Sequence, residues 1–444
     1  MSQAETHPGQ TRQQPSGGGR LATAAASVTA VAGAPPGAAR RSRLARLPER
    51  VPWLTPGDWA VLRVWLISRV ATLALSWAAI AYVEDSSSTG GSRPWLALWP
   101  HFDAIRLQHI AQYGYFGPPG HVVHFQVALF PGFPLAQALL QVLIRQWVVS
   151  GLLVSLIAGS VAAVALGRIA ELDYRPGTGT GAVLYLVASP AAFFLAAGYT
   201  EALFLAFALT AWLAARRGRW LLAALLAGGA SLIRVNGLFL LAALMVAALR
   251  SPAGWAGHAD GDRAEATPAQ RIRALAALLP ALIPPAAYEV YLKVRTGDWL
   301  AWSHAEANGW DRMLTSPLDS LRNTWEAGFG HGWLQPHTPD HNVVIAYLYQ
   351  LEIVAVATGL VAVIVLAARR RWPEAVYTGL TIGVLATSTL YQSVPRALLL
   401  LWPVWCGLAV AAARRAWVGQ LYLAVSVPVA AMIGLLFMTG NWAG

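Results

Sequence analysis

The feature that most constrains the fold is a series of long apolar runs separated by short, arginine-rich polar stretches. Several runs reach the ~20 residues that an α-helix needs to cross a bilayer. The apolar segments fall at 59–83, 127–145, 147–168, 181–197, 200–215, 220–249, 274–295, 342–368, 375–391, 396–413 and 417–438. They predict an all-α polytopic membrane protein with about ten to twelve transmembrane helices.

The composition supports this class and argues against a soluble protein. Hydrophobic residues make up 56% of the chain and charged residues 12%, with a mean hydropathy of +0.49. A soluble globular protein carries about 25% charged residues. The net charge of +11 comes almost entirely from arginine, with Lys293 as the one lysine. In a membrane protein this basic balance marks cytoplasmic loops, so we expect no nucleic acid partner.

The chain divides into two regions of different composition. Residues 1–57 are rich in Gly, Pro, Ser, Ala and Arg, and they predict a disordered basic tail in the cytoplasm. Residues 58–442 hold the apolar runs and form the predicted transmembrane domain. The single cysteine, Cys406, excludes an intramolecular disulfide.

Arginine clusters predict the orientation in the membrane. Cytoplasmic loops are enriched in arginine, and the clusters lie at 216–219, 369–371 and 414–415. This orientation places the loop 84–126 and the long loop 296–341 together on the extracytoplasmic side. We expect these loops to form the active site.

The orientation requires two irregular segments. The segment 127–145 must dip into the membrane without crossing it, or a later segment must not cross. The segment 220–249 must break into two short helices, near Gly228–Gly229 or at the "RVNG" stretch. Pro190 should also kink its helix, because proline removes a backbone donor and clashes with the preceding turn.

Asp103 is the first candidate functional residue. It lies in "WPHFDAIRLQHIAQYGY" (99–115), just beyond the first span, among aromatic side chains. Asp103 and Arg106 stand three residues apart and therefore share a helix face. One interpretation is a helix-start acid paired with Arg106. The other is a functional carboxylate, since ionisable residues near the membrane interior are costly.

Other polar residues interrupt apolar runs on the same predicted side. They are Glu201 in "GYTEALF", Arg234 and Asn236 in "SLIRVNGL", and Gln392 and Arg396 in "LYQSVPRALLLL". The arginines could extend toward lipid headgroups. Alternatively they could clamp an anion, because a guanidinium donates in pairs and stays charged.

Histidines raise the question of a metal site. The spacings His101-x-Asp103 and His121-x-x-His124 are compatible with metal ligation, but no cysteine or further acid completes a set. We therefore expect no metal. The chain also lacks the phosphate-loop, dinucleotide and zinc-protease motifs.

A carboxylate, arginines and many aromatic residues on one side of a membrane suit a glycosyltransferase with a lipid-linked sugar phosphate as donor. Two alternatives remain from the residues. One is a transporter or lipid flippase, although no internal repeat is visible. The other is a non-catalytic subunit of a transferase complex.

Six stretches, in order, resemble motifs of the PIG-V-type mannosyltransferases. They are "HFDAIRLQHIAQYGY", "VALFPGFPL", "SPAAFFLAAGYTEALF", "AGGASLIRVNGLFL", "TGDWLAWSHAEANGWDR" and "SVPRALLLLWPVW". The resemblance implies the GT-C fold, polyprenyl-phosphate-mannose as donor, and a lipid, glycan or protein as acceptor. It also implies an inverting transfer without a cofactor, by a protein that we expect to be a monomer.

The resemblance also assigns roles to individual residues. Asp103 is the implied catalytic base. The implied donor-phosphate residues are Arg234, Arg396 and Arg106. The implied substrate-orienting residues are Glu201, Asn236, Gln392 and Trp310.

Overall fold

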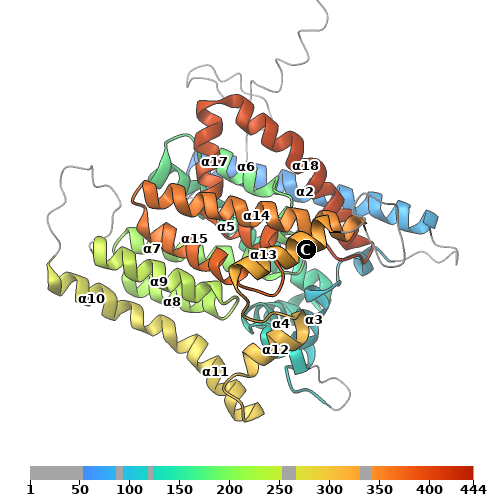
Figure 1. Ribbon diagram of the computed structural model, residues 1–444, viewed down its shortest axis with the longest axis horizontal. Helices are drawn as coiled ribbons and strands as arrows, with labels where there is room; N and C mark the ends of the chain where they lie inside the picture. Colours follow the sequence, from blue (N-terminus) through green and yellow to red (C-terminus); the bar gives the residue numbers. More distant parts are fainter. Residues whose placement is uncertain (1–53, 87–93, 119–123, 253–266, 331–342, 444) are drawn as a thin grey trace, which may run out of the picture. The chain divides into compact units, whose positions relative to one another are not determined.

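The computed structural model of the chain describes residues 54–86, 94–118, 124–252, 267–330 and 343–443 (Figure 1). Every regular element in these ranges is a helix, apart from an isolated bridge between Leu314 and Ser388. The prediction of an all-α protein is therefore confirmed for this part of the chain. Most of the predicted tail lies outside it.

Nine elements of the described residues lie between residues 54 and 199. They are α2 (Pro56–Ser86), η1 (Trp95–Leu98), α3 (Asp103–Tyr113), η2 (His124–Ala128), α4 (Gly132–Ile144), α5 (Trp147–Ile169), η3 (Ala170–Tyr174), α6 (Gly179–Val187) and η4 (Ala192–Leu195).

The remaining elements complete the assembly. They are α7 (Thr200–Arg216), α8 (Trp220–Ser231), α9 (Asn236–Arg250), α10 (Pro268–Leu278), η5 (Leu279–Leu282), α11 (Ile283–Thr296), α12 (Ala301–Trp310), α13 (Pro317–Phe329), α14 (Val343–Ala368), α15 (Trp372–Leu385), α16 (Val394–Leu399), α17 (Trp402–Arg414) and α18 (Ala416–Met438).

Five helical stretches among the described residues are long and apolar enough to cross a membrane. They are Pro56–Ala81, Trp147–Tyr174, Pro268–Thr296, Val343–Ala368 and Ala416–Met438. The expected ten to twelve transmembrane helices stay a prediction. Turns divide several apolar runs into helices that are too short to be counted among these five stretches. The length and apolar composition of these five stretches indicate a membrane protein.

The divided runs break where the sequence predicts. The run 220–249 forms α8 and α9, which are separated by residues 232–235 beside the "RVNG" stretch. The run 181–197 ends as a regular helix at Val187, shortly before Pro190. Helix α4 has 13 residues, about 20 Å, and is therefore shorter than the ~30 Å hydrocarbon core.

Helix α7 lies at the centre of the assembly and packs against α5 and α8. Nearly all of its residues are buried, which explains why it is apolar on every face. Small residues on α5 allow close packing with its neighbours. A Cβ built on Gly159 would lie 2.1 Å from the ring of Trp65, so this position requires glycine.

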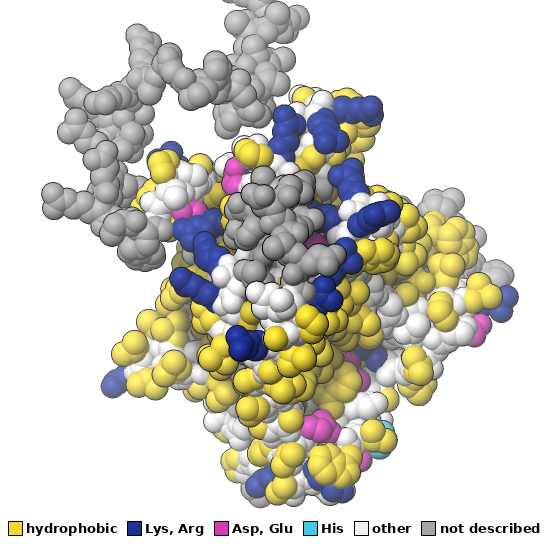
Figure 2. Space-filling model, turned by 90° about the vertical axis from the view of Figure 1, so that its left-hand side faces the viewer, with side chains coloured by type: hydrophobic (Ala, Val, Ile, Leu, Met, Phe, Trp, Pro, Cys, Tyr) yellow, Lys and Arg dark blue, Asp and Glu magenta, His cyan; other side chains and the backbone are white. Residues whose placement is uncertain are grey.

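The C-terminal end of α7 lies in a basic region of the protein. Arg216 pairs with Asp173, and Arg371 donates to the Asp173 carbonyl at 3.3 Å. Two of the predicted arginine clusters, at 216–219 and 369–371, therefore meet at one end of the assembly. Figure 2 shows basic side chains, which are arginines apart from Lys293 in this sequence, gathered on the face at the left of Figure 1. The first turn of α7 lies at the opposite end, about 25 Å away along the helix.

Candidate active site

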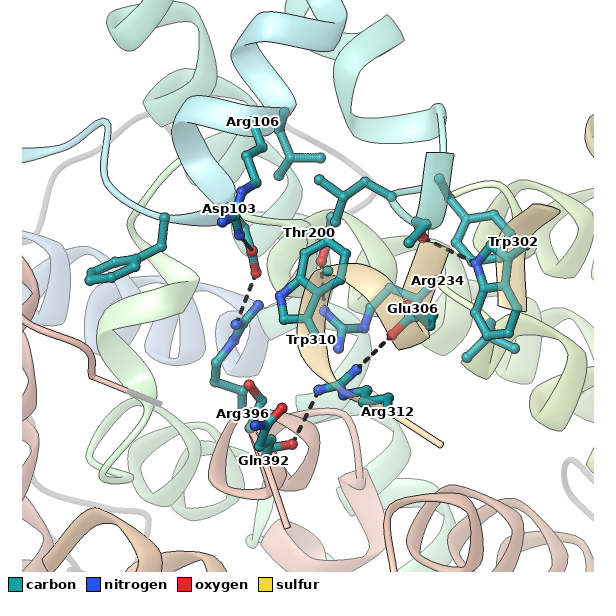
Figure 3. A pocket seen from close by; sticks show the side chains of 18 of the residues that line it. Asp103, Arg106, Thr200, Arg234, Trp302, Glu306, Trp310, Arg312, Gln392 and Arg396 are labelled. Atoms are coloured by element: carbon teal, nitrogen blue, oxygen red, sulfur yellow. Dashed lines mark hydrogen bonds and ion pairs between the residues drawn. The ribbon is translucent and has the colours of Figure 1, made fainter. Parts of the chain in front are cut away.

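A cavity of about 750 Å³ lies at the end of the assembly where α7 and α9 begin (Figure 3). Side chains from α3, α9, α12, α16 and the turn between α8 and α9 form its wall. Seven of the eight predicted site residues line it: Asp103, Arg106, Arg234, Asn236, Trp310, Gln392 and Arg396. Glu201, the eighth, is fully buried next to the cavity.

Asp103 is the first residue of α3. Phe102, just before it, has a φ of 50°, which is uncommon for a non-glycine residue and turns the chain sharply into the helix. The Asp103 side chain is 15% exposed, and its Oδ1 lies 3.5 Å from Arg106 Nη1, as the i,i+3 spacing predicts. Its Oδ2 accepts a hydrogen bond of 3.1 Å from Arg396 Nη1.

Glu201 lies in the first turn of α7, where the helix dipole favours an acid. Its Oε1 accepts hydrogen bonds from Arg234 Nη1 at 3.0 Å and from Arg396 Nε at 2.9 Å. Arg396 Nη2 lies 2.8 Å from the same oxygen. The carboxylate therefore fixes two guanidinium groups and does not face the cavity.

Arg234 and Arg396 differ in how much of each reaches the cavity. The Arg396 side chain is 8% exposed, and its guanidinium lies over the rings of Phe194 and Tyr199, 4.8 and 4.7 Å from their centroids. The Arg234 side chain is 21% exposed and also donates to Thr200 Oγ1 at 2.7 Å. Arg396 is thus the more rigidly held of the two.

Glu306 and Arg312 form a further ion pair in the wall, which we did not predict. Arg312 Nη1 lies 3.4 Å from Glu306 Oε2, and Arg312 Nη2 donates to the Gln392 carbonyl at 3.3 Å (Figure 3). Burial raises the pKa of Glu306, and the Arg312 guanidinium partly offsets this. In the sequence, this pair is visible only as an acid and an arginine six residues apart in "EANGWDR".

Aromatic side chains cover another part of the wall. Trp302 donates its Nε1–H to the Ala128 carbonyl at 3.1 Å, which fixes its ring beside the cavity. Trp310 packs edge-on against Phe125, and the Arg106 guanidinium lies 5.3 Å from the Trp310 ring centroid. Fixed aromatic rings offer flat apolar surfaces beside charged groups.

Asn236 and Gln392 lie in the wall near its charged residues. Asn236 is the first residue of α9 and donates to Thr381 Oγ1 at 3.3 Å. Gln392 contributes its main-chain carbonyl to Arg312. Both residues therefore have structural contacts in addition to their place beside the cavity.

Within the described part of the chain, no group of three or more His, Cys, Asp or Glu side chains is placed to hold a metal. Nδ1 of His109, near the site, lies 3.0 Å from Gln126 Oε1. His121 lies outside the described residues, so the predicted His121-x-x-His124 pair is not described.

The sequence matches a known family over part of its length. Residues 120–252 match the family model described as Mannosyltransferase (PIG-V). This segment contains Glu201, Arg234 and Asn236, whereas Asp103 and Arg396 lie outside it.

Two curated proteins are similar to the chain. The mouse GPI alpha-1,6-mannosyltransferase 2 is 32% identical over 217 residues, which is 43% of this chain and 43% of that protein. The human protein of the same name is 33% identical over 215 residues, covering 43% of this chain and 42% of its own length. The match thus spans less than half of each relative.

A solved structure overlaps more of the chain at lower similarity. The apo oligosaccharyltransferase of Archaeoglobus fulgidus has a TM-score of 0.42 and 13% identity, covering 86% of this chain and 56% of that one. The family match and the curated relatives together show that part of the chain is similar to PIG-V-type mannosyltransferases.

Proposed function

We propose that the protein is a membrane glycosyltransferase that moves a mannosyl unit from a polyprenyl-phosphate to an acceptor hydroxyl. The observation that carries this proposal is the shared cavity of Asp103 and the arginines 106, 234, 312 and 396. A proton acceptor and several phosphate-binding groups in one cavity suit this reaction. The names of the matched relatives support mannose as the sugar.

In this proposal Asp103 is the general base. The acceptor hydroxyl gives its proton to a carboxylate oxygen of Asp103 as the hydroxyl oxygen attacks C1 of the sugar. The bond between C1 and the phosphate oxygen breaks, and the polyprenyl phosphate leaves with the electron pair. A single displacement of this kind inverts the anomeric centre.

The arginines stabilise the negative charge on the leaving phosphate. Arg234 and Arg396 form the fixed part of this phosphate site because Glu201 holds them both. Arg106 and Arg312 are each 30% exposed, and their ion-pair contacts of 3.5 and 3.4 Å are longer than a good hydrogen bond. These two side chains can therefore turn toward the phosphate at little cost.

The remaining wall residues suit a sugar. A volume of about 750 Å³ lies within the usual range for small-molecule sites. Trp302 and Trp310 supply ring surfaces against which a sugar can pack, and Asn236 and Gln392 supply amide groups for its hydroxyls. Glu201 acts in this proposal by positioning the arginines rather than by contacting the sugar.

A transfer assay tests the proposal. The full chain is reconstituted in vesicles containing a membrane lipid extract and polyprenyl-phosphate-mannose labelled in the sugar. Label should move from the donor to extract components or, slowly, to water, and Asp103→Asn should slow this movement by ~10²-fold or more. GDP-mannose as sole donor should give no transfer.

The same assay tests the expected absence of a cofactor. The donor carries a single phosphate, whose charge the arginines can neutralise, so excess EDTA should leave the rate unchanged. Label that stays on the donor under all conditions, with folded protein, would overturn the proposed activity.

A further inference from the structure

Helix α13 is buried along a stripe of small and polar residues. The stripe consists of Ser320, Thr324 and Gly328, spaced i, i+4 and i+8 on one face. Ser320 and Thr324 are completely buried. This face therefore meets the protein without using large apolar side chains.

The large apolar side chains of α13 lie on a neighbouring stripe and are exposed. Leu318, Leu321 and Trp325 are 69%, 39% and 55% exposed. At 100° per residue this stripe lies about a quarter turn from the buried one. The acidic residues Asp319 and Glu326 occupy the other flank and are also exposed. An apolar flank of this kind needs an apolar partner.

The orientation of α13 is fixed by hydrogen bonds on its buried side. The Tyr391 N–H donates to Thr324 Oγ1 at 2.9 Å, and Asn323 Nδ2 donates to the Thr389 carbonyl at 3.0 Å. Gln350 of α14 donates to the Gly328 carbonyl at 2.8 Å. These bonds attach α13 to α14 and to the segment 389–391. The apolar flank therefore points away from the protein in a defined direction.

The position of α13 along α14 places it at a membrane boundary. Helix α14 ends at Ala368, directly before the arginines 369–371. About 20 residues, or ~30 Å of helix, span the hydrocarbon core. A span of 20 residues that ends at Ala368 begins at Tyr349. Gln350, the second residue of this span, is hydrogen-bonded to α13. Helix α13 therefore lies near the bilayer surface on the side of the cavity.

Exposed apolar side chains also occur on α14 and in the segment just before α13. On α14 the side chains of Val354, Val361 and Ile364 are 61%, 59% and 67% exposed, as expected for a helix that faces lipid. Met313 and Leu314, just before α13, are 54% and 91% exposed. Exposed apolar side chains therefore occur both on the helix that packs against α13 and on the segment that leads into it.

We propose that α13 lies in the membrane–water interface and binds phospholipid through Leu318, Leu321 and Trp325. An amphipathic helix with an apolar face and a charged face binds in this way, with its apolar side chains ~5–10 Å into the headgroup and acyl boundary. Trp325 suits this depth because tryptophan is enriched at the interface. Asp319 and Glu326 remain in water on the other flank.

This contact also positions the cavity. Helix α13 is bonded to Thr389 and Tyr391, and the next residue, Gln392, accepts a hydrogen bond from Arg312 in the cavity wall. Interfacial binding of α13 therefore holds that part of the wall at the depth where the phosphate of a lipid-linked donor lies. This last step rests on the proposed function, whereas the lipid contact of α13 does not.

Site-directed spin labelling tests the lipid contact without an activity assay. Single cysteines replace Leu318, Leu321 and Trp325 in a Cys406→Ala background, with Asp319→Cys and Glu326→Cys as matched controls on the same helix. Each labelled full-length protein is reconstituted in phosphatidylethanolamine–phosphatidylglycerol vesicles. Collisions with oxygen, which partitions into lipid, are compared with collisions with a water-soluble nickel chelate.

Labels at the three apolar positions should collide more with oxygen than with nickel, and the two controls should show the reverse. Nickel access at the apolar positions equal to that of the controls would overturn the proposal, because the flank would then face water. Low access to both reagents would also overturn it, since another protein segment or a second copy would cover the flank. The three positions are exposed, so a variant that fails to fold can be replaced by either of the others.

Discussion

The carboxylates of Asp103 and Glu201 are joined through one guanidinium, that of Arg396. Arg396 Nη1 lies 3.1 Å from Asp103 Oδ2, and Nη2 lies 2.8 Å from Glu201 Oε1. The proposed base and the buried acid are therefore parts of one charge network. The network connects α3, α7 and α16, so a change at any member should alter both stability and the cavity.

Glu201→Gln should be strongly destabilising. It leaves Arg234 and Arg396 without their shared counter-charge, and loss of one member of a buried ion pair costs ~3–5 kcal/mol. We expect a clear fall in the thermal unfolding temperature in detergent and a raised KM for the donor. Glu326→Gln, at an exposed position, is the control and should leave both unchanged. A normal unfolding temperature for the Glu201 variant would contradict the positioning role.

Arg396→Lys should weaken donor use more than Arg234→Lys. Lysine keeps the charge but cannot reproduce the three contacts that Arg396 makes to Asp103 and Glu201. Hydrogen bonds to charged groups are worth ~1.5–3 kcal/mol, so kcat/KM for the donor should fall about 10- to 100-fold. Arg322→Lys on the exposed side of α13 is the matched control. Full donor use in both site variants would leave the two arginines with a structural role only.

The helices and their interruptions could be predicted because they depend on local sequence. Apolar runs gave the helices, and the break between α8 and α9 lies beside the "RVNG" stretch, as expected. The number of spans stays a prediction, because an apolar run does not show whether a turn divides it into two short helices. Helices α16 and α17, within one apolar run, illustrate this.

The partners of the site residues could not be predicted in the same way. Glu201 contacts Arg234 and Arg396, which are 33 and 195 positions away in the sequence. Its complete burial follows from these distant contacts, so a role in contacting substrate was the natural expectation from sequence. Glu306 and Arg312 were missed because their position in the wall depends on how α12 packs against η2.

The orientation in the membrane can be measured with two introduced cysteines. Ser303 on α12 is exposed on the side of the cavity, and Arg369 is exposed at the basic end. In a Cys406→Ala background, Ser303→Cys should react with a membrane-impermeant thiol reagent in intact cells and Arg369→Cys should react only after permeabilisation. The opposite result would place the cavity in the cytoplasm. Equal reaction of both would contradict the two-sided arrangement.

Glu306 should give stability a specific pH dependence. Burial raises its pKa in the folded protein, so the folded state binds this proton more tightly than the unfolded chain. The stabilisation is complete below the ordinary carboxyl pKa of ~4.3 and is lost as the pH rises through the folded value. The unfolding temperature of wild type minus that of Glu306→Gln should therefore fall from about pH 4 to pH 7. A constant or rising difference would contradict the shift, and Glu326→Gln serves as the exposed control.

Asp103→Asn separates the two interpretations of Asp103, as a helix-start acid and as a functional carboxylate. Asparagine keeps the shape of the side chain and can still accept a hydrogen bond from Arg396, so stability should fall by only ~1–2 kcal/mol. It cannot accept the proton of the acceptor hydroxyl, and single-turnover transfer should therefore fall by ~10²-fold or more.

The control for this change is Asp311→Asn. Asp311 also lies in the cavity wall, and its φ of 53° suits asparagine, which tolerates the left-handed region. The control should transfer at nearly the normal rate, so a general loss of charge in the cavity is excluded as the cause. A folded Asp103→Asn protein with near-normal transfer would show that Asp103 only holds Arg396. Glu306, the other partly buried carboxylate of the wall, would then be the base to test.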